Sequence, residues 1–238
     1  MFLSLVFLLT EDHYLNDESL DDTARPFPHL APPPPHAYLH PMDTLPPHFV
    51  EIIEAVRELY VAQVAETVAG FSEETHVVEP VLLDAGGDVA GEGPLNLPYR
   101  ADYASLETGR LESFAAPREI RFDTFSFMIG GTEIVVAPFA WDYASLRVSG
   151  KWDGLATRLF ADWHHRAFGD DEPEDNIHLQ NVIHVASTPE VSDTGYAFEA
   201  DFGTAPASTM SDLLLALLAN SPDRIEIGAP DSEGEKSA

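Results

Sequence analysis

The side chains best suited to chemistry gather between positions 162 and 201. Imidazoles and carboxylates are the ligands that a cysteine-free site for zinc, iron or manganese would use. This stretch supplies them from His164, His165, His178 and His184, with Asp162, Asp170 and Asp171 nearby. A metal-assisted hydrolase is therefore one hypothesis, with His164, His184 and Asp201 as its candidate metal ligands.

The spacing of these histidines argues against a shared metal ion. Neighbouring residues on a helix diverge by about 100°, which places His164 at the flank of an apolar stripe and His165 on the solvent side. Six residues along a strand separate His178 from His184 by about 20 Å. We therefore expect no metal or other cofactor. Three of these rings or acids lying within a few ångströms of one point would count against a purely protein-binding role.

A second polar group is predicted on the outer face of a hairpin formed by 177–186 and 195–202. His184 next to Glu199 or Asp201 could act there as an acid or a base, but no substrate is indicated. The acidic loop 170–175 and this face are the predicted partner-binding surface. Its candidate residues are Asp170, Asp171, Glu172, Glu174, Asp175, His178, His184, Glu199 and Asp201.

Other catalytic motifs lack the accompanying segments that their function requires. Glycines in 85–98 are followed by no Gly-Lys-Ser/Thr, so no phosphate loop is predicted. Asp201-Phe202-Gly203 matches the magnesium motif of kinases, but the other kinase segments are missing. No Gly-x-Ser-x-Gly sequence is present, and we assign no catalytic residue.

The charge of the chain indicates the class of its partners. Twelve basic residues against 41 acidic ones give a net charge of −29. Such a chain repels nucleic acids and anionic membranes and would attract a basic protein. Our first hypothesis is a non-catalytic acidic binding module of the immunity-protein, inhibitor or chaperone type, as found in bacteria. Mimicry of nucleic acid is a further alternative, although no regular ladder of charges favours it.

Composition also predicts the compartment and the domain organisation. The chain has no cysteine, as expected for a reducing, cytoplasmic setting. The apolar run 2–9 resembles neither a good signal peptide nor a membrane anchor. Acidic residues and prolines then predict an open tail over 1–44. We expect one domain over 45–228 and a flexible tail over 229–238.

Hydrophobic periodicity predicts an α+β fold with a mainly antiparallel sheet and about three helices packed on one face. The helices are expected at 46–69, 151–169 and 206–220, and a short fourth one within 103–114. A strand is expected at 76–84, with Pro80 at a sheet edge, and another at 224–228.

Two hairpins are expected to form most of the sheet. Gly130-Gly131 should join 119–129 to 132–140 with Phe127 opposite Ile134 and a bulge near Asp123. The second hairpin should place Ile183 opposite Phe198. Strand 195–202, the third helix and strand 224–228 can form a βαβ crossover, so that these two strands need not pair.

Overall fold

The computed structural model describes residues 45–114, 121–169 and 179–230. Its helices are α1 (Pro47–Val68), α2 (Gly154–Phe168) and α3 (Ala207–Leu218). The strands are β1 (His76–Val78), β2 (Gly91–Glu92), β3 (Leu97–Pro98), β4 (Tyr103–Ser105), β5 (Leu111–Glu112), β6 (Phe125–Ile129), β7 (Thr132–Val136), β8 (Ala144–Ser149), β9 (Val185–Ala186), β10 (Glu190–Val191), β11 (Tyr196–Asp201) and β12 (Arg224–Gly228). This confirms the predicted α+β class and the three long helices.

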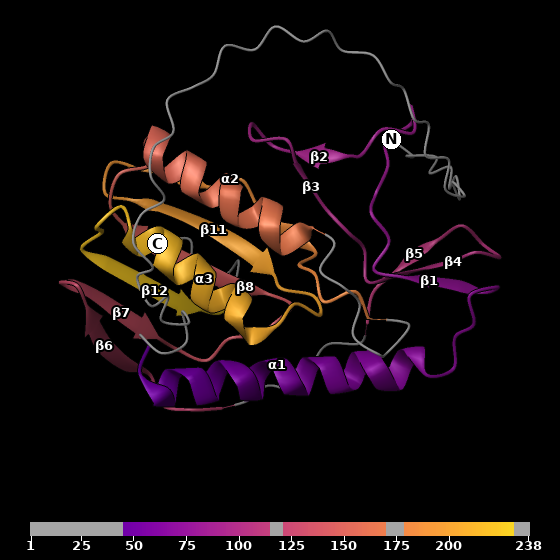
Figure 1. Cartoon of the computed structure of the whole chain (residues 1–238), viewed down its shortest axis with the longest axis horizontal. Coiled ribbons are helices and arrows are strands. Elements are labelled where there is room, and N and C mark those ends of the chain that lie inside the picture. Colours follow the sequence, from indigo (N-terminus) through magenta and orange to yellow (C-terminus); the bar gives the residue numbers. More distant parts are fainter. Residues whose placement is uncertain (1–44, 115–120, 170–178, 231–238) are drawn as a thin grey trace, which may run out of the picture.

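Seven strands form the main sheet, in the order β10-β11-β8-β12-β7-β6, with β9 also paired to β11. All pairs are antiparallel except β12 with β7. β11 and β12 lie on either side of β8 and are joined through α3, so the predicted crossover is confirmed. Helices α2 and α3 cover one face of the sheet (Figure 1).

The core lies between this sheet and the helices, because apolar residues alternate along the strands with the period of two. Ile134, Leu146, Phe198 and Ile225 are fully or almost fully buried on the helical side. Phe160 of α2 packs edge-on against Phe198, with ring centroids 4.9 Å apart. No helix within the described ranges is long and apolar enough to cross a membrane.

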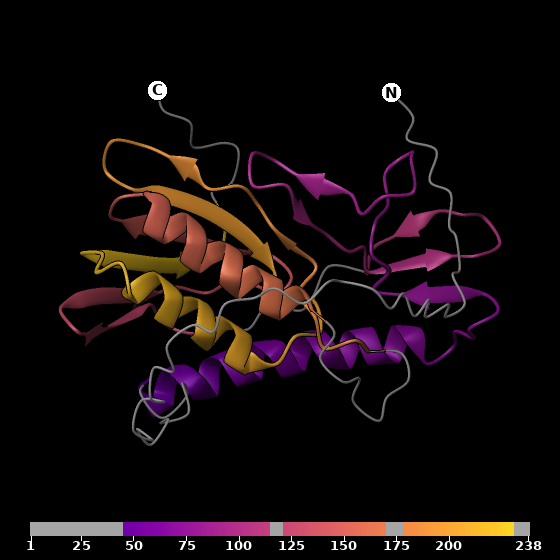
Figure 2. The ribbon, with the colours of Figure 1, turned by 45° about the horizontal axis from the view of Figure 1, so that its top comes forward.

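Helix α1 connects the main sheet to a smaller one. Its buried stripe is Phe49, Ile53, Val56, Tyr60, Val64 and Val68. Phe49 contacts Phe127 of β6, with ring centroids 5.4 Å apart. The other end of the helix reaches the three-stranded sheet β1-β4-β5, as Figures 1 and 2 show. The helix therefore holds the two sheets beside each other.

The first hairpin has the predicted register, with Phe125 opposite Val136, Phe127 opposite Ile134 and Ile129 opposite Thr132. Both linking glycines have positive φ, 59° and 96°, as the two-residue turn requires. The bulge expected near Asp123 is wrong, because β6 begins only at Phe125 and Asp123 is not paired.

The predicted helix within 103–114 is also wrong. These residues form the antiparallel pair β4–β5, with Tyr103 opposite Glu112. Gly109 has a φ of 65° and its N–H donates to Ser105 O, so the chain reverses in a tight turn. The expected strand 76–84 is limited to β1, which lies at a sheet edge as predicted. Pro80 lacks the N–H that a longer ladder would need.

The register of the second hairpin differs from the prediction. Ala186 lies opposite Ala200, and Val185 lies opposite Asp201. Ile183 is therefore not opposite Phe198, which pairs with Leu146 of β8. The backbone of Ile183 instead donates to Ala167 O at the end of α2, so the chain leaves the sheet before His184. Ala186 and Ala200 are both buried, and His184, two residues before Ala186 in an extended chain, lies on the same buried side.

Candidate metal centre

The candidate site lies where four strand ends meet between the two sheets. Glu79 directly follows β1, Asp102 directly precedes β4, His184 directly precedes β9, and Asp201 ends β11. Backbone hydrogen bonds hold these ends together. The N–H of His184 donates to Asp201 O (3.0 Å), and the N–H of Glu79 donates to Asp102 O (2.8 Å). Residues far apart in the chain are thus fixed around one imidazole.

His184 is 1% exposed and is surrounded by three carboxylates. Its Nε2 lies 2.8 Å from Glu79 Oε1. Its Nδ1 lies 3.1 Å from Asp102 Oδ1 and 3.2 Å from Asp201 Oδ2. Since Nδ1 carries at most one hydrogen, a single N–H faces two anionic acceptors.

Glu79 is held more firmly than the other carboxylates. Its side chain is 0% exposed. It accepts a hydrogen bond from Gln180 N–H (2.7 Å), another from Thr204 N–H (3.1 Å), and contacts the Thr204 hydroxyl at 2.8 Å. Its φ of 50° is unfavourable for a residue with a Cβ. A buried, strained and fully hydrogen-bonded acid fixes the orientation of the imidazole.

Gly203 allows the ring to approach the backbone. Its φ is 47°, and a Cβ at this position would lie 2.5 Å from His184 Cδ2 and 2.5 Å from Val182 O. Its N–H donates to Asp201 Oδ1 at 2.8 Å. The residues that spell a kinase motif therefore have a different use, since Asp201 contacts the imidazole and Gly203 leaves space for it.

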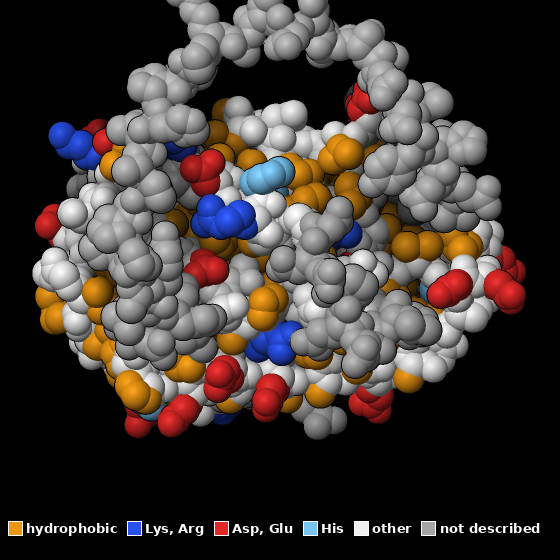
Figure 3. All heavy atoms as spheres, in the orientation of Figure 1, with side chains coloured by type: hydrophobic (Ala, Val, Ile, Leu, Met, Phe, Trp, Pro, Cys, Tyr) orange, Lys and Arg blue, Asp and Glu red, His pale blue; other side chains and the backbone are white. Residues whose placement is uncertain are grey.

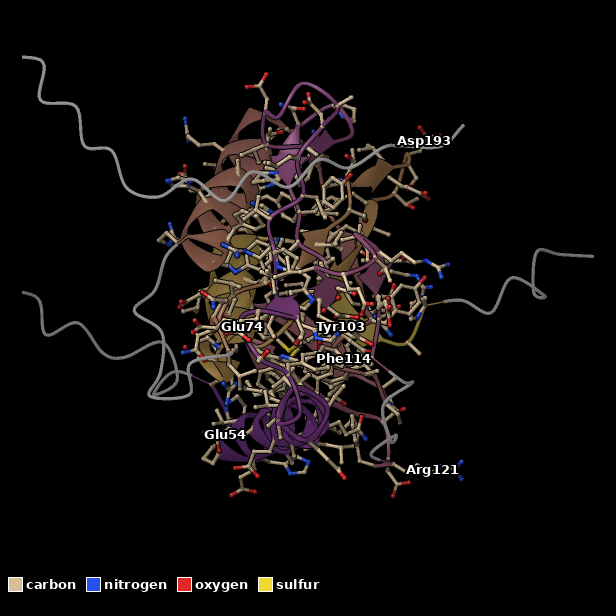
Figure 4. All side chains as sticks on the ribbon, turned by 90° about the vertical axis from the view of Figure 1, so that its right-hand side faces the viewer. Glu54, Glu74, Tyr103, Phe114, Arg121 and Asp193 are labelled. Carbon is tan, nitrogen blue, oxygen red and sulfur yellow. The ribbon has the colours of Figure 1, made fainter. Side chains whose placement is uncertain are left out.

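Asp102 is oriented from the side of the small sheet. Phe114 N–H donates to its Oδ2 at 3.1 Å, and the buried Tyr60 hydroxyl of α1 donates to its Oδ1 at 3.4 Å. Phe114 also packs against Tyr103, with ring centroids 5.3 Å apart, and both lie above α1 in Figure 4. Aromatic packing therefore limits the movement of this carboxylate.

The electrostatics of the site follow from its three acids. Burial by itself lowers the pKa of His184, but the charge of Asp201 and hydrogen bonds with Asp102, Asp201 and Glu79 raise it well above 6.5. Burial would raise the pKa of Glu79 and of Asp102, but His184 lowers both. In the metal-free protein, His184 is therefore an imidazolium among carboxylates.

The same atoms have the spacing of a metal coordination shell. His184 Nδ1 and one oxygen each of Asp102 and Asp201 all lie within 4.8 Å of one another. Ligands at 2.1 Å from a cation are about 3.0 Å apart when they subtend 90°, close to the two Nδ1–oxygen distances of 3.1 and 3.2 Å. A divalent cation can take the place of the Nδ1 proton, and Glu79 then supports the ligand from behind through Nε2–H.

Only part of the predicted ligand set converges. His184 and Asp201 come together, but His164 does not join them. It lies on α2, 1% exposed, stacked on Phe168 with ring centroids 5.5 Å apart. His164 lies within the buried stripe of α2 and not at its flank as predicted, whereas His165 is exposed as expected.

The predicted partner-binding residues are separated by the structure. Asp170, Asp171, Glu172, Glu174, Asp175 and His178 lie outside the described residues. Glu199 is half-buried, opposite Ser145 of β8. The placement of His184 on the outer face with Glu199 is wrong, because the observed register pairs Ala186 with Ala200 and puts His184 on the buried side.

Two members of the site, Glu79 and Asp102, were not predicted from the sequence. One feature of the sequence could have drawn attention to Asp102. Asp-Tyr-Ala-Ser-Leu occurs twice, at 102–106 and at 142–146. Both copies lead into a strand, and their alanines and serines are equally buried, with Ala104 and Ala144 at 0% and Ser105 and Ser145 at 8% and 7%. No comparable pattern marks Glu79.

Comparison with models of protein families, with curated proteins and with solved structures finds no match to this chain.

Proposed function

We propose that this protein is a metal-assisted hydrolase whose divalent cation is bound by His184 Nδ1, Asp102 and Asp201. One observation carries the proposal. A single imidazole nitrogen faces two carboxylate oxygens at 3.1 and 3.2 Å, while the other nitrogen is bound to a third carboxylate. A protonated ring satisfies this arrangement only in part, because one hydrogen is shared between two acceptors.

The exposure of the ligands supports a catalytic role over a closed structural site. Glu79 and His184 are 0% and 1% exposed, whereas the side chains of Asp102 and Asp201 are 15% and 23% exposed. Three protein ligands on a partly open cation leave positions for water and substrate. The cation would lower the pKa of its bound water and supply a nucleophile near neutral pH. Glu79 would hold the imidazole in the tautomer that coordinates.

Metal binding is the first test. Protein stripped with a chelator is titrated with Mn²⁺ and with Zn²⁺ by calorimetry, and bound metal is counted after gel filtration. We expect about one equivalent in the wild type. His184→Gln keeps an amide for Glu79 but removes the Nδ1 ligand, so its affinity should fall at least about tenfold.

His165→Gln is the matched control, since it removes an exposed histidine from α2 and should leave binding unchanged. A wild type that retains less than about a tenth of an equivalent of either metal contradicts the proposal. Loaded protein is then assayed on chromogenic esters, amides and phosphate esters. Hydrolysis that His184→Gln abolishes and His165→Gln retains is the expected result.

A second candidate is the acidic binding module, and the charge of the molecule favours it. The net charge is −29, and the acids on the exposed side of α1 are Glu51, Glu54, Glu58 and Glu66. Helix α1 runs along the lower edge of the molecule in Figure 1, and Figure 3, in the same orientation, shows acidic side chains along that edge. Capture of a basic protein that weakens sharply between low and high salt supports this function. Capture that does not depend on salt contradicts it.

A further inference from the structure

A fourth carboxylate, that of Asp142, lies beside the candidate metal centre. Asp142 is in the bend between Ala140 and Tyr143, just before β8. The carbonyl of Trp141 accepts from Phe202 N–H at 3.1 Å, and Ala144 pairs with Ala200 of β11. The backbone on either side of Asp142 is therefore attached to the chain around Asp201.

The side chain of Asp142 has an unused ligand atom. Its Oδ1 is buried and has no hydrogen-bond partner among the described residues. A buried carboxylate oxygen without a donor is costly, because it has lost its water and gained nothing in exchange. Burial first, and then the charges of Asp201 and Asp102, raise the pKa of Asp142 to about 6. This carboxylate is thus close enough to the centre to be repelled by its acids.

The sequence around Asp142 repeats the sequence around a ligand. Asp102 and Asp142 are the first residues of the two Asp-Tyr-Ala-Ser-Leu segments. Each segment leads into an antiparallel strand with a fully buried alanine, Ala104 in β4 and Ala144 in β8. The two copies therefore place an aspartate just before the start of one strand in each of the two sheets.

We infer that Asp142 is a fourth ligand of the loaded centre, which makes it a site of one imidazole and three carboxylates for a hard cation such as Mn²⁺ or Mg²⁺. The inference rests on the proposed metal centre and deepens it by naming the class of metal. Oxygen-rich sets suit Mg²⁺ and Mn²⁺, whereas catalytic zinc is usually bound by two or three histidines, or by thiolates. Without a cation, repulsion between like charges keeps Asp142 apart from the three atoms that converge. With a cation, that repulsion is neutralised and the free Oδ1 gains a partner.

The test compares Asp142→Asn with Asp193→Asn by titrating free Mn²⁺ through its electron paramagnetic resonance signal. Asparagine keeps the shape and removes the charge and one oxygen. Asp193 is exposed and lies at the outer edge of the molecule in Figure 4, so its variant controls for the loss of one acid. We expect Asp142→Asn to weaken Mn²⁺ binding at least about tenfold and Zn²⁺ binding by a smaller factor. Asp193→Asn should stay within about twofold of wild type for both.

Repeating the titration in about 0.5 M KCl separates ligation from simple attraction, because salt screens charges that act at a distance. A weakening that persists supports the ligand role, and one that disappears overturns it. Equal Mn²⁺ affinity of Asp142→Asn and wild type also overturns the inference and leaves the three-ligand centre intact. A wild type that binds neither metal instead refutes the proposed function itself.

Discussion

Two buried histidines in this protein differ in charge near neutral pH, one protonated and one neutral, although each is 1% exposed. His184, between the two sheets, is in contact with Glu79, Asp102 and Asp201. His164, on the inner side of α2, is in contact with the rings of Trp163 and Phe168. Its Nε2 has no hydrogen-bond partner among the described residues. The surroundings therefore differ in charge and not in access to water.

Burial imposes a similar penalty on the charged form of both rings, and the neighbouring groups decide which of them carries a proton. Desolvation lowers the pKa of both rings. At His184, the carboxylates outweigh it and raise the pKa well above 6.5. At His164, desolvation first and the charge of His165 second lower the pKa to about 4, although a hydrogen bond with the Pro98 backbone opposes them. His184 is therefore a cation among carboxylates, at the position where we propose that a metal binds, whereas His164 is a neutral ring packed against Trp163 and Phe168.

The largest effect is expected from removing the charge at the centre. His184→Leu leaves three carboxylates facing one another without a cation, and Glu79 is completely buried. Losing one partner of a buried ion pair typically costs about 3–5 kcal/mol. We expect the free energy of unfolding in urea at pH 7 to fall by that amount.

His165→Leu is the control for the effect of His184→Leu, with an expected change of about 0.5 kcal/mol or less at an exposed position. A His184→Leu variant as stable as this control would mean that the acids around position 184 are not ionised together.

The next effect is a pH dependence that belongs to His164. Unfolding raises the pKa of this ring from about 4 to its ordinary 6.5. The unfolded chain therefore binds the proton first, and stability is lost as pH falls from 6.5 to 4. The loss is on the order of 3 kcal/mol, at 1.4 kcal/mol for each pH unit.

Urea unfolding of wild type and His164→Leu at pH 7 and pH 4.5 measures this contribution. The contributions of acids that titrate in both proteins cancel when the two free energies of unfolding are subtracted. We expect the free energy of unfolding of His164→Leu to rise relative to that of the wild type as pH falls, because leucine takes up no proton on unfolding. Parallel pH profiles would show that His164 is not held neutral in the fold.

The smallest effect is expected at the support of Asp102. Burial, and then the charges of Asp201 and Asp102, raise the pKa of Tyr60 far above 10, so its hydroxyl remains a donor. The hydrogen bond is long, 3.4 Å, and Tyr60→Phe should cost about 0.5–1 kcal/mol.

Tyr103→Phe removes a hydrogen bond to Glu112 of similar length, 3.3 Å, that is exposed to solvent, and provides the matched control. Thermal unfolding should show the larger loss for Tyr60→Phe. Equal losses would mean that the Tyr60 hydroxyl adds nothing to the holding of Asp102.

Local patterns in the sequence predicted much of the fold. The stripes of α1, α2 and α3 are spaced by the helical period, and the Gly130-Gly131 turn fixed the register of β6 and β7. The second hairpin was misjudged, because a strand pattern over 177–186 cannot show that Ile183 bonds to Ala167 instead of to a strand. The pairing of Ala186 with Ala200 differs from the predicted register by an odd number of residues, which moves His184 from the outer face to the buried one.

The candidate site was predicted only in part, for the same reason. His184 and Asp201 are close in sequence, and a β-pairing of their segments was expected, so their proximity could be anticipated. Glu79 and Asp102 reach the site from the small sheet, across 105 and about 80 residues of chain. Their contacts with His184 depend on how α1 holds the two sheets beside each other.

The amino-acid sequence by itself determined the three helices, the glycine-linked hairpin and the excess of negative charge, because each depends on neighbours within a few residues or on composition alone. Tertiary structure decided which of two buried histidines meets carboxylates. The pKa of an imidazole depends on charges within a few ångströms of it, and here the packing of two sheets on one helix brings those charges together.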